Sequence, residues 1–192
     1  MLKLNDAEIR SFFISWLNSK YIKPQMILNE VTISDGYARP DILAIYSFSH
    51  CYEIKGDNDK IERILKQALH YQASFKKNTL ITTEKHIYKA QEILPSAWGI
   101  ILAQPISNGS SYYIKFKYIR KSSYNSMYQK NIASKILWKE EMQKLLSKKN
   151  ISTKSKFTRF DLIDLITDTA NSEELDKFIC GCLLNRKVLQ HI

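Results

Sequence analysis

The chain has 192 residues, of which 44% are hydrophobic and 25% are charged, and its formal net charge is +10. This length supports one well-packed catalytic domain with an appendage, and the hydrophobic content excludes a chain that is disordered throughout. No apolar run approaches the ~20 residues that a membrane helix needs, and the start MLKLNDAEIR does not resemble a signal peptide. We therefore expect a cytoplasmic protein without a membrane partner, in which Cys51, Cys180 and Cys182 are reduced thiols that bind no metal.

Hydrophobic periodicity predicts an α/β fold in which helices alternate with short strands. A helix is expected over 5–19, where Asn5-Asp6-Ala7-Glu8 has the form of a capping box. The strands predicted at 78–82 and 98–103 contain no ionisable residue, as expected of strands covered on both faces. After the first helix, the predicted order is strands at 29–33, 41–47 and 51–56, a helix at 59–76, a strand at 78–82, a helix at 84–93 and a strand at 98–103.

Two carboxylates and a lysine lie in the second and third of these strands. Asp41 opens the run DILAIY, and Glu53 and Lys55 lie in the run CYEIK, where residues two apart point to the same face. A hairpin between the runs would bring Asp41 beside Glu53, so we expect Asp41, Glu53 and the Ile54 carbonyl to hold one Mg²⁺ or Mn²⁺ ion. Such an ion would activate a water, Lys55 would orient it or offset charge at phosphorus, and Gly56 would let a phosphate approach.

The spelling P-D…E-x-K resembles the signature of the PD-(D/E)XK nuclease superfamily. The resemblance implies a restriction-endonuclease-like αβββαβ core, a central mixed sheet with helices on both sides, and metal-dependent phosphodiester hydrolysis. In that superfamily an acidic residue upstream completes the metal site, which points to Glu30 in NEVTI, with Glu8 as a rival. The alternative interpretation of the short motif is an exposed Asp at a strand start and a surface Glu/Lys pair.

A second motif lies on the helix predicted after the E-x-K strand. Gln67 and Tyr71 are one helical turn apart and share a face. The pair is similar to the Q-x₃-Y motif of the RecB-like branch, whose members use it to line the site and contact the nucleic-acid strand. The alternative is a solvated Gln and a half-buried Tyr.

The whole chain resembles a small bacterial and phage family of unknown function within that superfamily. The shared segments include ARPD, YEIKGDNDKIERILKQALHY, PSAWGIILA, ILWKEEMQKLL and a C-terminal LL-x-R. They span nearly all of the chain, so the resemblance strongly implies the fold. It implies less about the reaction, because the family has no established reaction.

The positive charge belongs to the C-terminal half. Residues 93–160 contain thirteen basic and two acidic residues, a net charge of +11, while the rest of the chain carries −1. Tyrosines are interleaved with these basic residues, and aromatic faces can stack on exposed bases. The sequence therefore predicts a nucleic-acid partner, which we expect to be DNA; a solubilising surface with core tyrosines is the alternative.

We divide the chain into a nuclease-like domain, 1–125, and a basic helical module, 126–192, joined by the polar stretch SSYNSMYQKN. The module is expected to contain a helix over ASKILWKEEMQKLLSKK, one opening at Thr158 and one over SEELDKFICGCLLNRK. Two of these helices flank a basic loop, a pattern similar to SAP-type DNA-binding modules; a small helical cap is an equal alternative. The predicted nucleic-acid contacts are Arg39, Lys148, Lys149, Lys154, Lys156 and Arg159.

These features predict a metal-dependent nuclease of defence, repair or phage biology, compatible with a homodimer. The alternative is a non-catalytic protein on a nuclease scaffold that binds nucleic acid or another protein.

Overall fold

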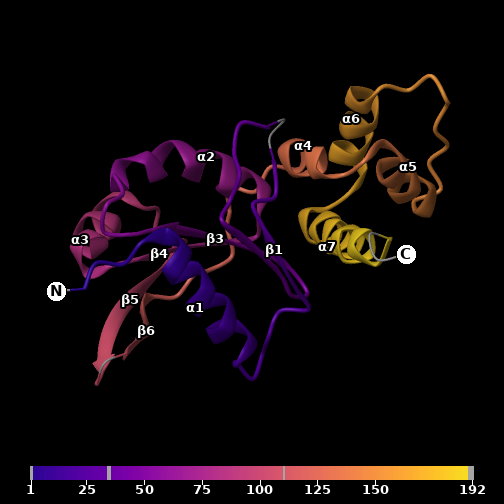
Figure 1. The fold of residues 1–192 in the computed structure, drawn as a ribbon. Coiled ribbons are helices and arrows are strands. Elements are labelled where there is room, and N and C mark those ends of the chain that lie inside the picture. Colours follow the sequence, from indigo (N-terminus) through magenta and orange to yellow (C-terminus); the bar gives the residue numbers. More distant parts are fainter. Residues whose placement is uncertain (1, 34–35, 110, 190–192) are drawn as a thin grey trace.

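The computed structural model describes residues 2–33, 36–109 and 111–189. A six-stranded sheet forms its centre, and helices cover both faces (Figure 1). The strands follow one another across the sheet in chain order: β1 (Met26–Asn29), β2 (Ile42–Ile45), β3 (Ser49–Lys55), β4 (Lys77–Thr82), β5 (Gly99–Asn108) and β6 (Ser111–Arg120). The helical elements are α1 (Asp6–Asn18), η2 (Ile61–Arg63), α2 (Ile64–Ser74), α3 (Glu84–Ile93), α4 (Lys130–Ala133), η3 (Ser134–Ile136), α5 (Lys139–Lys148), α6 (Arg159–Thr169) and α7 (Ser172–Leu189).

The sheet is mixed. β1, β2 and β3 form an antiparallel meander, β3, β4 and β5 run parallel, and β6 returns antiparallel to β5. Parallel neighbours need crossover connections, which α2 and α3 supply. The predicted α/β class is confirmed at this level.

Two hydrophobic clusters hold the layers together. On one face, α1 packs Ile9, Phe13 and Leu17 against the sheet, next to Tyr52 and Ile54 of β3. The opposite face is covered by α2 and α3. Because strand side chains alternate between faces, β3 contributes buried residues to both layers and is buried along its whole length.

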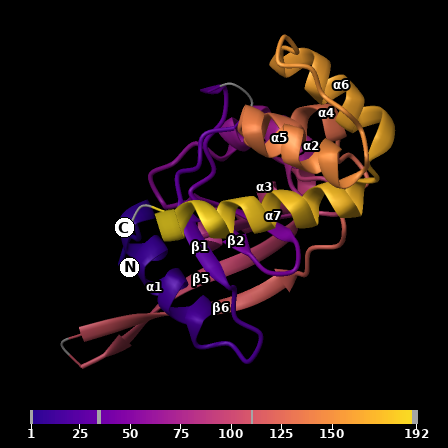
Figure 2. The same cartoon turned by 90° about the vertical axis from the view of Figure 1, so that its right-hand side faces the viewer.

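The C-terminal helices extend the core on the α2 side (Figure 2). Buried residues of α5, α6 and α7 belong to the same hydrophobic cluster as those of α2 and β3. The polar stretch after β6 is fixed to the sheet layer, since Asn125 N–H donates to the Lys76 carbonyl at 2.9 Å and Gln129 N–H to the Ala73 carbonyl at 2.9 Å. The proposed boundary at residue 125 therefore lies in an ordered connection across which one core is shared.

Local sequence signals place several elements as predicted. Asn5 and Glu8 form the reciprocal capping box at the start of α1, and Thr158 with Asp161 forms another at the start of α6. Among the described residues, none of the helices has the length and apolar composition needed to cross a bilayer.

The strand predicted at 29–33 is displaced. Pairing with β2 covers Met26–Asn29, and Glu30 then takes a positive φ of 54°. This conformation belongs to the left-handed region and ends an extended strand. Tertiary pairing with the buried β2 thus prevails over the β-branched composition of NEVTI.

The predicted helix ASKILWKEEMQKLLSKK is interrupted. Leu137 and Trp138 are extended, and α5 begins only after them. The carbonyls freed by the break accept hydrogen bonds from arginine side chains: Arg186 donates to Ile136 O and Arg159 to Leu137 O, each at 2.9 Å. These arginines lie far along the chain, so helical periodicity gives no sign of the break. The helix predicted from 59 likewise starts later, with η2.

Candidate active site

The hairpin of β2 and β3 sets Asp41 beside Glu53. Ile42 pairs with Tyr52, so extending the antiparallel register by one residue places Asp41 opposite Glu53. The Asp41 carboxylate accepts a hydrogen bond from Ile54 N–H at 2.7 Å. The N–H and C=O of one strand residue point the same way, so the Ile54 carbonyl also faces Asp41, beyond the end of β2.

Glu53 is the centre of a buried hydrogen-bond network. Its side chain is 2% exposed and accepts from Lys55 Nζ at 2.5 Å, Gln67 Nε2 at 2.7 Å and Tyr71 Oη at 2.9 Å. Lys55 shares the face of β3 with Glu53, and Gln67 and Tyr71 project from successive turns of α2. The structure thus brings together four predicted site residues from two elements.

The environment changes the proton affinity of Asp41. Burial, followed by the charge of Glu53 and of Asp6, raises the pKa of Asp41 from 3.8 to about 7. Burial and the charge of Glu53 also raise the pKa of Tyr71. This phenol therefore stays protonated and donates a hydrogen bond to Glu53. Two carboxylates are therefore held close together in a buried site, where Lys55 and Arg10 are their cationic partners.

Sequence reasoning missed Arg10 and Asp6 on α1. The Arg10 guanidinium donates to Asp41 at 2.8 Å, Asp6 at 3.0 Å and Glu30 at 3.0 Å. Only the i, i+4 spacing of Asp6 and Arg10 could have indicated the pair, because the contact with Asp41 bridges 31 positions. Glu30 is 47% exposed and meets the site through Arg10. Arg39 lies beside it, 63% exposed and 3.6 Å from Glu30.

The donor set fits a divalent metal in part. Among the residues described, no three His, Cys, Asp or Glu side chains are grouped as metal ligands; the predicted set has two carboxylates and a backbone carbonyl. Two buried acceptors beside it, Gln67 Oε1 and Asp6 Oδ1, have no hydrogen-bond partner in the described part of the chain. Buried polar atoms of this kind are normally satisfied, and water molecules around a hard cation would supply their donors. Asp41, Glu53 and the Ile54 carbonyl are the residues that would hold the ion.

The expectation for Gly56 was wrong. A Cβ at this position would lie 2.7 Å from the Leu4 carbonyl oxygen. The N-terminal segment packs there, with Asp57 N–H donating to Leu4 O at 2.9 Å and Leu4 N–H to the Asp57 carboxylate at 2.7 Å. The glycine therefore accommodates the chain's own backbone, and the space predicted for a phosphate is filled.

The predicted nucleic-acid contacts of the C-terminal module fall into two groups. Lys149 is paired with Glu174 at 2.8 Å, and Arg159 donates to two backbone carbonyls at the break before α5, so both support the structure. Lys154 and Lys156 are exposed on the loop between α5 and α6.

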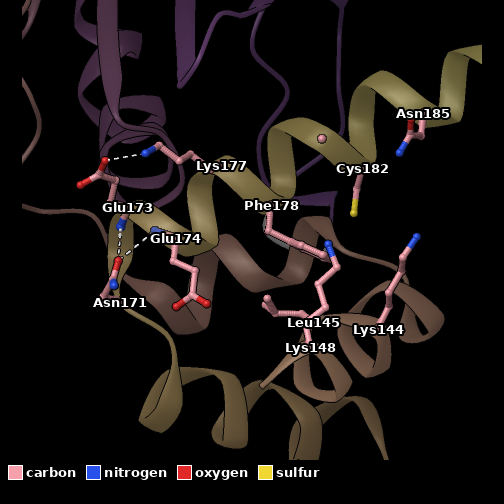
Figure 3. A pocket seen from close by; sticks show the side chains of 11 residues that line it. Lys144, Leu145, Lys148, Asn171, Glu173, Glu174, Lys177, Phe178, Cys182 and Asn185 are labelled. Atoms are coloured by element: carbon pink, nitrogen blue, oxygen red, sulfur yellow. Dashed lines mark hydrogen bonds and ion pairs between the residues drawn. The ribbon is translucent and has the colours of Figure 1, made fainter. Parts of the chain in front are cut away.

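Lys148 borders a hollow of about 600 Å³ between α5 and α7, with its ammonium 5.2 Å from the centre of the Phe178 ring (Figure 3). Glu173 and Glu174 line the same hollow, so its charge is mixed.

Comparison with known proteins gives one family. The sequence profile described as "Bacteriophage P4 protein cII" matches residues 2–189. Protein cII of Enterobacteria phage P4 is 26% identical over 184 residues, which cover 95% of this chain and 68% of the phage protein. No solved structure matches the chain significantly.

Proposed function

The chain belongs to the bacteriophage P4 protein cII family, and we propose that it is a metal-dependent nuclease that hydrolyses phosphodiester bonds of DNA. The observation that carries the proposal is the environment of Glu53. One buried carboxylate is held by Lys55, Gln67 and Tyr71, with Asp41 across the hairpin. A structural ion pair would need only one of these partners.

The fold supports the same proposal. The meander of β1, β2 and β3, followed by α2 and by β4 parallel to β3, is similar to the αβββαβ core of PD-(D/E)XK nucleases. The E-x-K motif lies at the end of the third strand and Q-x₃-Y on the next helix, in the order that the RecB-like branch uses. We propose this finer fold assignment on the agreement between topology and motif positions.

Each side chain has a separate task in the proposed reaction. A bound Mg²⁺ or Mn²⁺ ion would lower the pKa of a coordinated water and polarise the scissile phosphate. Lys55 orients the attacking water and offsets charge on the phosphate oxygens as the water–phosphorus bond forms and the bond to the leaving sugar oxygen breaks. Gln67 and Tyr71 fix the Glu53 carboxylate by donating to its two oxygens.

The substrate class follows from charge. The +11 segment 93–160 provides cations for a polyanion, and the exposed Arg39 lies next to the acidic site where a scissile phosphate would arrive. The charge supports a nucleic acid as the substrate class, and DNA is the substrate that we propose.

A cleavage assay with matched variants tests the proposal. Circular and linear DNA, single- and double-stranded, are incubated with Mg²⁺, Mn²⁺ or EDTA, and cleavage is expected only with metal. Glu53→Gln and Lys55→Arg should lose most cleavage while keeping DNA affinity, since Arg has a different donor geometry from Lys. Glu92→Gln changes an exposed glutamate and should cleave normally. Wild-type turnover in both Glu53→Gln and Lys55→Arg would refute the proposal.

A second candidate, a non-catalytic nucleic-acid- or protein-binding protein on this scaffold, is favoured by one contact. Arg10 already supplies a cation to Asp41, Asp6 and Glu30. A protein of this kind would bind its partner in EDTA as well as in Mg²⁺ and would cleave none of the substrates.

A further inference from the structure

A second hollow lies on the other face of the sheet from the Glu53 side chain, where β2 turns into β3. It encloses about 630 Å³, within the usual size range of ligand pockets. Its floor is His50 and Tyr52 at the start of β3, and Lys77 and Tyr118 of β4 and β6 form part of its wall. His50 and Tyr52 face the α1 side of the sheet, since strand side chains alternate, whereas Glu53 faces α2. The hollow and the candidate active site thus lie on opposite faces.

Aromatic rings dominate this hollow. His50 and Tyr52 are stacked with centroids 4.1 Å apart, and Tyr46 and Phe48 with centroids 5.4 Å apart. Tyr118 is 47% exposed, and Tyr46 and Phe48 are half-buried, so ring surface remains open to a ligand. The exposed parts of these rings can stack on planar rings of a ligand.

The floor is polar but uncharged. His50 Nε2 lies 2.8 Å from Thr79 Oγ1, and Nδ1 lies 3.1 Å from Tyr52 Oη. Burial, together with the charge of Lys77, lowers the pKa of His50 to about 3, so the imidazole is neutral at physiological pH. The rim instead supplies positive charge.

Three lysines, Lys23, Lys77 and Lys121, line the hollow, and among the described residues no Asp or Glu does. Lys77 Nζ lies 4.9 Å from the Phe48 ring centre and 4.7 Å from that of Tyr124, which extends the aromatic surface outward. The neighbouring hollow beyond Phe48 does contain acidic side chains, Glu173 and Asp176, and Asp176 is held there by Ser49. Aromatic faces and lysines in one concavity match the two chemical parts of an unpaired nucleotide: a base to stack and a phosphate to neutralise.

We infer that this hollow binds single-stranded DNA by stacking one or two unpaired bases on Phe48, Tyr46 and Tyr118, with Lys77 and Lys121 at the phosphates. Bases of an intact duplex are stacked on one another and do not present their faces, so the site selects unpaired strands. The inference does not depend on cleavage, because the side chains of His50 and Tyr52 in the hollow point to the opposite face of the sheet from the Glu53 side chain.

Fluorescence anisotropy of a labelled oligo(dT) in EDTA measures this binding without cleavage. Phe48→Leu removes the ring and keeps apolar volume, and it should weaken oligo(dT) binding roughly five- to a hundredfold, as expected for losing one base stack. Lys121 is exposed, so Lys121→Glu should leave the fold intact, and it should weaken binding as well. Tyr88→Leu, which removes a ring 82% exposed on α3, is the matched control and should bind normally.

Two results would overturn the inference. One is an oligo(dT) affinity within about twofold of wild type in both Phe48→Leu and Lys121→Glu, because the loss of one base stack should weaken binding by at least about fivefold. The other is an equal loss of duplex and single-strand affinity in Phe48→Leu. Glu53→Gln should retain oligo(dT) binding, so failure of the nuclease proposal and failure of this one are distinguishable.

Discussion

At the scale of single residues, Asp41 has a charge that changes near neutral pH. Its pKa of about 7, against 3.8 for a free side chain, means that the folded protein binds more protons than the unfolded chain between these values. The free energy of unfolding contributed by Asp41 therefore decreases as pH rises through this window. A metal ion binds the ionised form and reverses the preference.

We expect the affinity for Mn²⁺ to rise with pH up to about 7 and then to level off, with a proton released on binding below that value. Isothermal titration calorimetry in buffers of different ionisation enthalpy measures both quantities. Asp41→Asn should remove the pH dependence along with most of the affinity. Asp168 is exposed on α6, and Asp168→Asn should preserve both the pH dependence and the affinity. A Mn²⁺ affinity that is constant across the window in the wild type would contradict the assignment.

Arg10 is the second residue with a sharp prediction. Its side chain, about 20% exposed, forms ion pairs with three carboxylates, one of which is the proposed metal ligand Asp41. Arg10→Gln should lower the metal-free free energy of unfolding by on the order of 1–3 kcal/mol and should tighten Mn²⁺ binding. Thermal melts with and without Mn²⁺ test this, with Arg63→Gln as the control; weaker Mn²⁺ binding by Arg10→Gln would show that Arg10 supports the metal site.

At the scale of elements, α7 is joined to β3 by one buried carboxylate. Asp176 is 2% exposed and accepts from Ser49 Oγ at 2.5 Å and from Ser49 N–H at 3.0 Å. Burial raises the pKa of Asp176, so its ionised form depends on these two donors. The contact joins residues 127 positions apart and fixes the C-terminal helices on the sheet.

Asp176→Ala leaves buried donors of Ser49 without a partner and should lower the free energy of unfolding by roughly 1–3 kcal/mol. Urea denaturation measures the loss, and a double-mutant cycle with Ser49→Ala isolates the coupling. Asp168→Ala, on the exposed face of α6, should change stability by less than about 0.5 kcal/mol. Equal effects of Asp176→Ala and Asp168→Ala would mean that α7 is held by apolar packing alone.

At the scale of the whole molecule, the uneven charge predicts how DNA binding depends on salt. Each phosphate contact contributes ~0.7–0.9 to the slope of log affinity against log salt. Of the basic residues predicted to bind DNA in the C-terminal module, Lys148, Lys154 and Lys156 are the exposed ones, while Lys149 and Arg159 are held by the fold.

Replacing Lys148, Lys154 and Lys156 together by Gln should weaken duplex binding and reduce the salt slope, with little effect on stability. Anisotropy titrations at several salt concentrations measure the slope. The control replaces Lys3, Lys60 and Lys89 in the N-terminal half with the same total charge change. If both triple variants have the wild-type slope, the C-terminal module is a structural cap or a protein-docking surface.

Local pattern alone determined much of this protein. Apolar runs predicted the positions of β2, β4 and the first half of β5, because strands covered on both faces favour continuous hydrophobic residues. Strand alternation put Glu53 and Lys55 on one face, and helical spacing put Gln67 and Tyr71 on another. Each of these relations spans four residues or fewer, and backbone geometry fixes such short distances.

Only the tertiary structure decided the contacts between distant segments. Arg10 donates to Asp41, 31 positions along the chain, and the Leu4 backbone fills the space beside Gly56. Arg159 donates a hydrogen bond to the Leu137 carbonyl at the break before α5. The turn at Glu30 and the extended residues before α5 follow from pairing and packing that outweigh local preference. Periodicity reports which face of an element is buried, but which partner covers that face depends on how the whole chain packs.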